Sequence, residues 1–189
     1  MSRIYLIRHA KPSAGWGADD DDPGLDETGS AQAQAAAKSL LALPQAVRPI
    51  RVVSSPLRRC QETARPFAAA IGATLEIDPL VGEIPTPRGM AADARGPWLR
   101  KAFTGRWSEI EGDRDYDAWR REVTEAVASR PGAAVFSHFV AINAVLTTLA
   151  GEPQMITLRP DHASISTFAL EDGRLRLIER GREASTQVL

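Results

Sequence analysis

Three short apolar segments, separated by helix-forming stretches, constrain the fold of this chain more than any other feature. They are Arg3 to Ile7, Ile50 to Ser54 and Ala133 to Ser137, each about five residues long. Segments this short and this continuously apolar are typical of strands buried on both faces. Because helical stretches lie between them, they predict an α/β fold: a three-layer sandwich in which helices cover both faces of a mostly parallel sheet.

The connecting stretches supply the expected helices and a further pair of strands. Alanine- and leucine-rich runs favour helix, and prolines and glycines mark their ends. We expect helices over residues 29–43, over residues 55–71 with Ser55 as N-cap and a kink or break at Pro66, over residues 115–130, and over residues 141–149. Residues 164–170 and 175–178 predict a terminal hairpin-like pair around the turn at residues 171–173.

Composition excludes several classes of protein. The chain has 43% hydrophobic and 25% charged residues, which is typical of a globular protein, and its net charge of -1 lacks the basic excess that favours nucleic acids. Cys60 is the only cysteine, so an internal disulfide and a Cys-based zinc site are both excluded. The apolar run at residues 4–7 is too short for a signal-peptide core or a membrane span, and we expect a cytoplasmic protein with no membrane partner.

Polar side chains follow each of the three predicted strands directly. The first strand ends in Arg8 and His9, the second leads through Ser55 to Arg59, and the third leads to His138. In open α/β sheets the ligand crevice lies outside the carboxyl ends of the strands, so these side chains should meet. Arginine binds phosphate oxygens bidentately, and a histidine can attack phosphorus. The set therefore predicts a phosphoryl-transfer site.

Residues 84–114 differ from the rest of the chain. They contain three prolines and two tryptophans, Trp98 and Trp107, with weak periodicity. We predict an insertion over the active-site face, with a short helix near residues 98–103, within a single domain that spans residues 1–189.

Four motifs resemble those of the histidine phosphatase superfamily, the phosphoglycerate mutase-like proteins. They are Leu-Ile-Arg-His-Ala at residues 6–10, residues 23–29, residues 55–64 and Val-Phe-Ser-His at residues 135–138, and their order and spacing match over most of the chain.

The resemblance implies a role for each matching residue. His9 would be the phosphorylated nucleophile, Arg8 and Arg59 the phosphate clamp, and His138 a second histidine in contact with the phosphoryl group. Glu83 falls where many members place the acid that protonates the leaving oxygen. The family uses no metal, and we expect neither a metal nor a cofactor.

Other positions concern the substrate. Lys11 adds positive charge where the family often has Gln or Glu, and Phe139 replaces the usual glycine, which we expect to narrow the pocket. Lys11, Trp16 and His162 are candidate substrate contacts, although packing would also explain Trp16 and His162. Cys60 is expected to be buried and inert.

These observations predict a metal-independent phosphatase that hydrolyses a phosphomonoester through a covalent phosphohistidine on His9. Its substrate would be a phosphorylated small molecule or a phosphoprotein. A protein phosphohistidine phosphatase, a phosphoglycerate mutase and a non-catalytic phosphate-binding or interaction module are the alternatives. The intact set of two histidines and two arginines speaks against the module, because a binding protein needs no nucleophile. The sequence indicates no oligomeric state.

Overall fold

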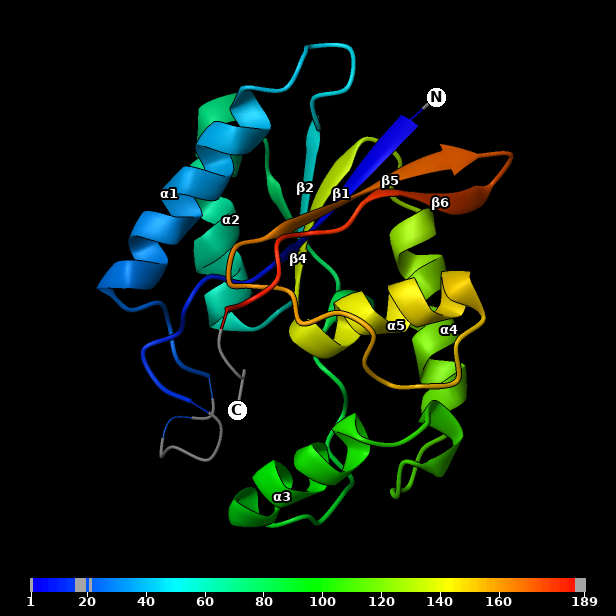
Figure 1. The fold of residues 1–189 in the computed structure, drawn as a ribbon. Helices are drawn as coiled ribbons and strands as arrows, with labels where there is room; N and C mark the ends of the chain where they lie inside the picture. The colour runs from blue at the N-terminus through cyan, green and yellow to red at the C-terminus, as the bar shows by residue number, and fades with distance from the viewer. Residues whose placement is uncertain (1, 16–19, 21, 186–189) are drawn as a thin grey trace.

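A central β-sheet with helices on both faces forms the computed structural model, which describes residues 2–15, 20 and 22–185 (Figure 1). In this described part, the sheet has six strands in the order β3-β2-β4-β1-β5-β6. The strands are β1 (Ser2–Arg8), β2 (Arg51–Ser54), β3 (Leu75–Ile77), β4 (Ala133–Ser137), β5 (Ile165–Glu171) and β6 (Arg174–Glu179). The helices are α1 (Glu27–Leu41), α2 (Arg58–Ile71), α3 (Ala92–Phe103), α4 (Tyr116–Ala128) and α5 (Phe139–Ala150), with short 3-10 helices η1 (Pro79–Val81) and η2 (Trp107–Glu109).

The predicted three-layer α/β fold is confirmed. Strands β1, β2, β3 and β4 pair in parallel, and β5 and β6 add an antiparallel pair beside β1. Figure 1 shows α1 and α2 on one side of the sheet and α4 and α5 on the other. The carboxyl ends of the central strands β1 and β4 therefore lie next to each other, as the sequence predicted.

The central strands are apolar on both faces because both faces are covered. In β1, Ile4 and Leu6 pack into the core on the α4 and α5 side, whereas Tyr5 and Ile7 pack into the core on the α1 and α2 side. This alternation follows from the two-residue period of a strand. It also places Arg8, the next residue in the alternation, on the α5 side of the sheet edge.

The expected N-cap of the second helix is wrong. Helix α2 begins at Arg58 with Leu57 as its N-cap, two residues later than a cap at Ser55 predicts. The Ser55 hydroxyl instead accepts a hydrogen bond from the Leu57 amide and lies 2.7 Å from the ring of His138. Pro66 does not divide the helix, which continues to Ile71.

The segment at residues 84–114 forms more helix than its sequence predicted. Helix α3 begins at Ala92, six residues before Trp98, and lies beyond the carboxyl ends of the central strands (Figure 1). Trp98, Leu99 and Trp107 belong to the same buried core as α4 and α5. The segment is thus anchored by its own apolar side chains. Its description as an insertion in a single domain stays a prediction.

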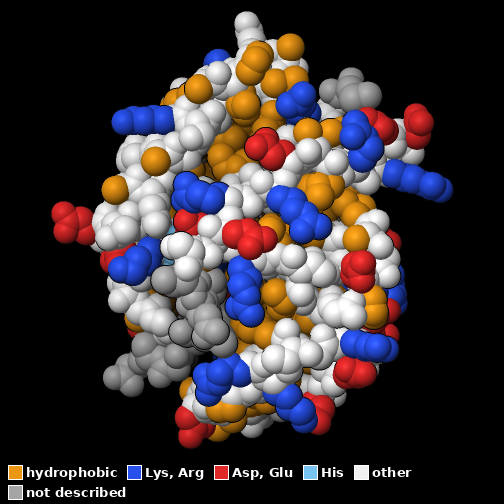
Figure 2. Space-filling model, in the orientation of Figure 1, with side chains coloured by type: hydrophobic (Ala, Val, Ile, Leu, Met, Phe, Trp, Pro, Cys, Tyr) orange, Lys and Arg blue, Asp and Glu red, His pale blue; other side chains and the backbone are white. Residues whose placement is uncertain are grey.

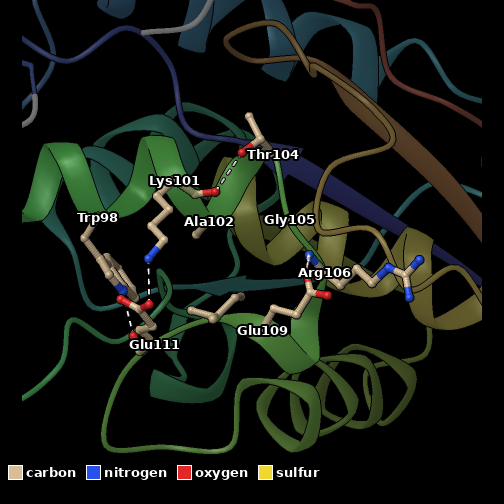
Figure 3. A pocket seen from close by; sticks show the side chains of 9 residues that line it. Trp98, Lys101, Ala102, Thr104, Gly105, Arg106, Glu109 and Glu111 are labelled. Atoms are coloured by element: carbon tan, nitrogen blue, oxygen red, sulfur yellow. Dashed lines mark hydrogen bonds and ion pairs between the residues drawn. The ribbon is translucent and has the colours of Figure 1, made fainter.

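A hollow of about 220 Å³ separates α3 from η2 (Figure 3). Two of its charged lining residues form an ion pair: the ammonium group of Lys101 lies 2.6 Å from a carboxylate oxygen of Glu111. The indole N–H of Trp98 donates to the backbone carbonyl of Glu111 at 2.7 Å. These contacts tie α3 to the loop that follows η2.

The surface carries mixed charge. On the face shown in Figure 2, lysine and arginine side chains are interspersed with aspartate and glutamate side chains. Among the helices that the structure describes, none combines the length and the apolar character that crossing a membrane requires.

Helix α1 packs closely against the chain segment that follows His9. Asp26, its N-cap, accepts a hydrogen bond from the Gly29 amide at 2.6 Å and forms an ion pair with the Lys11 ammonium at 2.8 Å. At Gly29 an added Cβ would lie only 2.0 Å from the backbone carbonyl oxygen of Lys11. Gly29 is therefore required by close approach of two backbones.

We predict that Gly29→Ala destabilises the protein by about 2 kcal/mol, because the methyl group would displace backbone next to His9. The matched control is Gly96→Ala in α3, where the added Cβ would lie 3.4 Å from the flexible Arg100 side chain. Helix propensity alone favours alanine by up to about 1 kcal/mol at both sites. The free energy of unfolding from urea titration measures both effects, and equal stabilisation by the two substitutions would contradict this account of Gly29.

Candidate active site

Pairing between β1 and β4 brings the two histidines together. Arg8 lies opposite Ser137 in the parallel register, and the His9 amide donates to the Ser137 carbonyl at 2.9 Å. His9 and His138 each follow directly on the ends of these strands. Their ring centroids lie 5.3 Å apart, with the ring planes tilted by 59°. The pairing of β1 with β4 thus places both imidazoles at the same edge of the sheet.

One ring nitrogen of His9 is held by the backbone. Nδ1 lies 2.8 Å from the carbonyl oxygen of Ala10. A carbonyl can only accept, so Nδ1 carries the proton and Nε2 keeps its lone pair. The Ala10 amide donates to Thr63 Oγ1 at 2.9 Å, and that hydroxyl donates to the Arg59 carbonyl, which ties the loop to α2. The arrangement leaves Nε2 as the ring nitrogen with a free lone pair.

The Arg8 guanidinium is hydrogen-bonded through one nitrogen, whereas a second nitrogen has no partner among the described residues. Its Nη1 donates to the Pro160 carbonyl at 2.8 Å, and its Nε is buried without a hydrogen-bond partner among the described residues. The guanidinium carbon lies 5.4 Å from the ring centre of Phe139. The Phe139 ring is buried in the core, and the guanidinium of Arg8 stacks over its face as a cation–π contact. Burial lowers the pKa of Arg8 to about 10, so the group stays charged at neutral pH.

Arg59, rather than Arg58, lies in the site. Arg59 is almost fully buried in the first turn of α2, and its Nη2 lies 3.4 Å from Nδ1 of His138. Arg58 points to solvent and pairs with Glu62 at 2.7 Å, which agrees with its expected place on the exposed helix surface.

His138 is fully buried and contacts groups on both of its ring nitrogens. Nε2 lies 2.7 Å from Ser55 Oγ and 3.3 Å from Cys60 Sγ, whereas Nδ1 faces Arg59. A guanidinium only donates, so Nδ1 is the accepting nitrogen and Nε2 donates to Ser55. Cys60 is buried as expected, and burial raises the pKa of its thiol. Ser55, which was predicted to be a helix cap, is thus a hydrogen-bond partner of His138 in the site.

Glu83 lies at the same site, and its environment favours the protonated carboxyl. Its Oε2 is 3.7 Å from His138 Nδ1 and is buried without a hydrogen-bond partner in the described structure, while Oε1 accepts from the Ile84 amide at 3.0 Å. Burial raises the pKa of Glu83, against the opposing charges of Arg59, Arg95 and Arg8.

Burial and the surrounding cations keep the two histidines neutral. The pKa of His9 is well below its usual value because of burial first, and then because of His138, Arg8 and Arg59. Burial, Arg59 and Arg8 lower the pKa of His138 in the same way. A neutral imidazole keeps the lone pair that a nucleophile requires, and guanidiniums are groups that can bind an anion.

The family model of the histidine phosphatase superfamily (branch 1) matches residues 4–182. The chain belongs to this superfamily. The sequence resemblance and the fold prediction are both confirmed by this match. No curated protein matches the chain.

Solved structures of other superfamily proteins resemble this one over nearly their full length. Mycobacterial glucosyl-3-phosphoglycerate phosphatase in complex with inorganic phosphate is 26% identical, with 99% of this chain and 100% of that chain covered and a TM-score of 0.70. Phosphoserine phosphatase from Entamoeba histolytica in complex with 3-phosphoglyceric acid is 18% identical, with 98% of each chain covered and a TM-score of 0.72. At this lower identity the likeness shows the shared fold alone.

The three residues predicted as candidate substrate contacts differ in how the structure places them. Lys11 is half-exposed and paired with Asp26. His162 lies next to His9, with 5.7 Å between the ring centroids. Trp16 lies outside the described residues. In the described part of the chain, no three His, Cys, Asp or Glu side chains are grouped so that they could hold a metal ion.

Arg95 also belongs to the surroundings of this site, although the sequence did not predict it. It shares the inner face of α3 with Trp98, Leu99 and Ala102, which follow it at helical spacing. Its charge lowers the pKa of both Glu83 and His138, and its Nε is buried without a hydrogen-bond partner among the described residues. The helical spacing was the available signal, but it required the correct start of α3.

We predict that Arg95→Met raises the pKa of Glu83, because the substitution removes a guanidinium that stabilises the carboxylate. Arg100→Met is the matched control, since Arg100 is exposed on the same helix. Carbon NMR of glutamate-labelled protein gives the carboxyl titration directly, with Glu83→Gln assigning the signal. Identical titration of Glu83 in wild type and Arg95→Met would show that Arg95 does not act on this site.

Proposed function

We propose that this protein is a phosphatase that transfers the phosphoryl group of a phosphomonoester to Nε2 of His9 and then to water. The observation that carries the proposal is the hydrogen bond from His9 Nδ1 to the Ala10 carbonyl, which leaves Nε2 unprotonated among cationic groups. A group that served only to bind phosphate would be better as a charged donor than as a neutral imidazole.

In the first step, the Nε2 lone pair of His9 attacks phosphorus and the bond from phosphorus to the ester oxygen breaks. The departing oxygen takes the proton of the Glu83 carboxyl and leaves as an alcohol. Arg8 and Arg59 stabilise the negative charge of the equatorial oxygens in the transition state. The raised pKa of Glu83 supports this role, because a general acid must hold its proton before the reaction.

In the second step, water attacks the phosphorus of the phosphohistidine. The Glu83 carboxylate takes a proton from the water, and the phosphorus–nitrogen bond breaks with its electron pair returning to Nε2. Inorganic phosphate leaves, and both His9 and Glu83 regain their starting states. Every step uses groups supplied by the chain, the ester and water.

Family membership and the phosphate complex of the mycobacterial relative support a phosphorylated small molecule as substrate. The burial of Glu83 favours an ester over a phosphohistidine substrate. An alkoxide is a poor leaving group and gains most from a proton, whereas a phosphoramidate nitrogen needs less help. A buried carboxyl with a raised pKa is therefore better explained by ester hydrolysis.

We expect wild type to hydrolyse both aryl and alkyl phosphates and His9→Ala to hydrolyse neither. Glu83→Gln should lower kcat for alkyl phosphates by about 10²-fold or more and should affect good aryl leaving groups less. In wild type, kcat for alkyl esters should fall as pH rises through the raised pKa of Glu83, and this alkaline limb should disappear in Glu83→Gln.

Steady-state kinetics on a matched pair of aryl and alkyl phosphates measures these effects, with Arg100→Met as an exposed control. Wild-type protein that hydrolyses no phosphate ester in a broad panel would contradict the proposed function. Equal losses for aryl and alkyl substrates in Glu83→Gln would contradict the role of Glu83 alone.

A further inference from the structure

A short loop before β5 is held tightly against the nucleophile. Arg8 donates to the Pro160 carbonyl at 2.8 Å, the Arg8 amide donates to the Ser164 carbonyl at 3.2 Å, and the Ala163 amide donates to the Arg8 carbonyl at 3.1 Å. Both ends of the loop are therefore attached to the residue that precedes His9.

The loop at residues 160–164 also contacts Arg182, and its backbone is strained at Ala163. Asp161 pairs with Arg182 at 2.9 Å and accepts from the His162 amide at 2.8 Å. Ala163 has a φ of 56°, a left-handed conformation that side chains other than glycine rarely adopt. Such strain persists only where surrounding contacts impose it, and it is found most often at ligand sites. The result is a fixed backbone position for His162.

This fixed loop places the imidazole of His162 next to His9. The His162 ring lies 5.7 Å from the His9 ring, and neither of its nitrogens has a hydrogen-bond partner among the described residues. Arg8, His9, Arg59 and His138 are almost fully buried, whereas His162 is partly exposed. The organic part of a substrate must extend from the buried phosphoryl site toward solvent. Among these five residues, His162 is the one that is open to solvent.

The charges around His162 favour a neutral ligand group there. Burial and the charges of Arg8 and Lys11 lower its pKa to about 4, although Asp161 and Asp26 oppose the shift. Lys11 and Asp26 neutralise each other at 2.8 Å. A neutral imidazole offers one donor and one acceptor, which is the complement of a hydroxyl group. The cationic groups Arg8 and Arg59 are already assigned to the phosphoryl oxygens.

We propose that His162 is a substrate-binding residue that contacts a hydroxyl group on the leaving group, so that phosphate esters of polyols are preferred over simple alkyl phosphates. This inference rests on the proposed phosphatase function. It assigns to His162 the selection of the alcohol and leaves the phosphoryl chemistry to His9.

Glycerol 1-phosphate and propyl phosphate test the proposal, because they share a three-carbon chain and differ in their hydroxyl groups. The ratio of their kcat/KM values should be about tenfold in wild type, the size expected for one good hydrogen bond. His162→Phe keeps a flat ring without nitrogen and should bring the ratio close to one. His162→Gln keeps a donor and an acceptor and should restore part of the preference.

Inhibition by inorganic phosphate reports whether the phosphoryl site remains intact in each variant. An unchanged inhibition constant together with a collapsed ratio supports the proposal. A wild-type ratio near one, or equal losses for both substrates in His162→Phe, overturns it. Failure of wild type to hydrolyse even an aryl phosphate would instead refute the phosphatase function itself.

Discussion

The alignment of the carboxyl ends of β1 and β4 is the constraint on which the rest of the site depends. Parallel pairing places Arg8 beside Ser137, and the hydrogen bond from the His9 amide to the Ser137 carbonyl extends the pairing by one residue. Because side chains alternate along a strand, a slip of one residue would turn Arg8 to the opposite face of the sheet and displace His9 from its position beside His138. Apolar side chains on both faces of β1 oppose such a slip, and core packing thereby sets the geometry of the proposed reaction.

Burial gives the gathered groups their chemical character. At one edge of the sheet, burial lowers the pKa of His9 and of His138 and raises the pKa of Glu83, beside the guanidiniums of Arg8 and Arg59. Without a bound anion, such a site lowers the stability of the fold, because buried positive charges lack negative partners. A phosphate ester supplies such a partner. The structure thus suits a bound phosphoryl group with a nucleophile on one side and a proton donor nearby.

Much of this arrangement could be predicted because it depends on local pattern. Apolar runs locate β1, β2 and β4, and the residues after them are brought together by the rule for parallel sheets. Strand β3 has only three residues, none of them fully buried, so periodicity gives no signal. Ser55 was interpreted as a cap because its contact with His138 spans 83 positions of sequence. Arg95 was not predicted because Gly96 and Pro97 disfavour helix in the first half of α3, and its spacing from Trp98 and Leu99 is informative only when the helix begins before it.

The chemical identity of a trapped phosphoenzyme tests the proposed mechanism most directly. Rapid mixing with a phosphate ester, quenching in alkali and phosphorus NMR of the isolated peptide would locate the phosphoryl group on a particular nitrogen. The backbone hydrogen bond at Nδ1 of His9 predicts phosphorylation of Nε2 of that residue, with the adduct stable in alkali and lost in acid. Phosphorylation of Nδ1, of His138 or of His162, or turnover with no phosphoenzyme at all, would contradict the account.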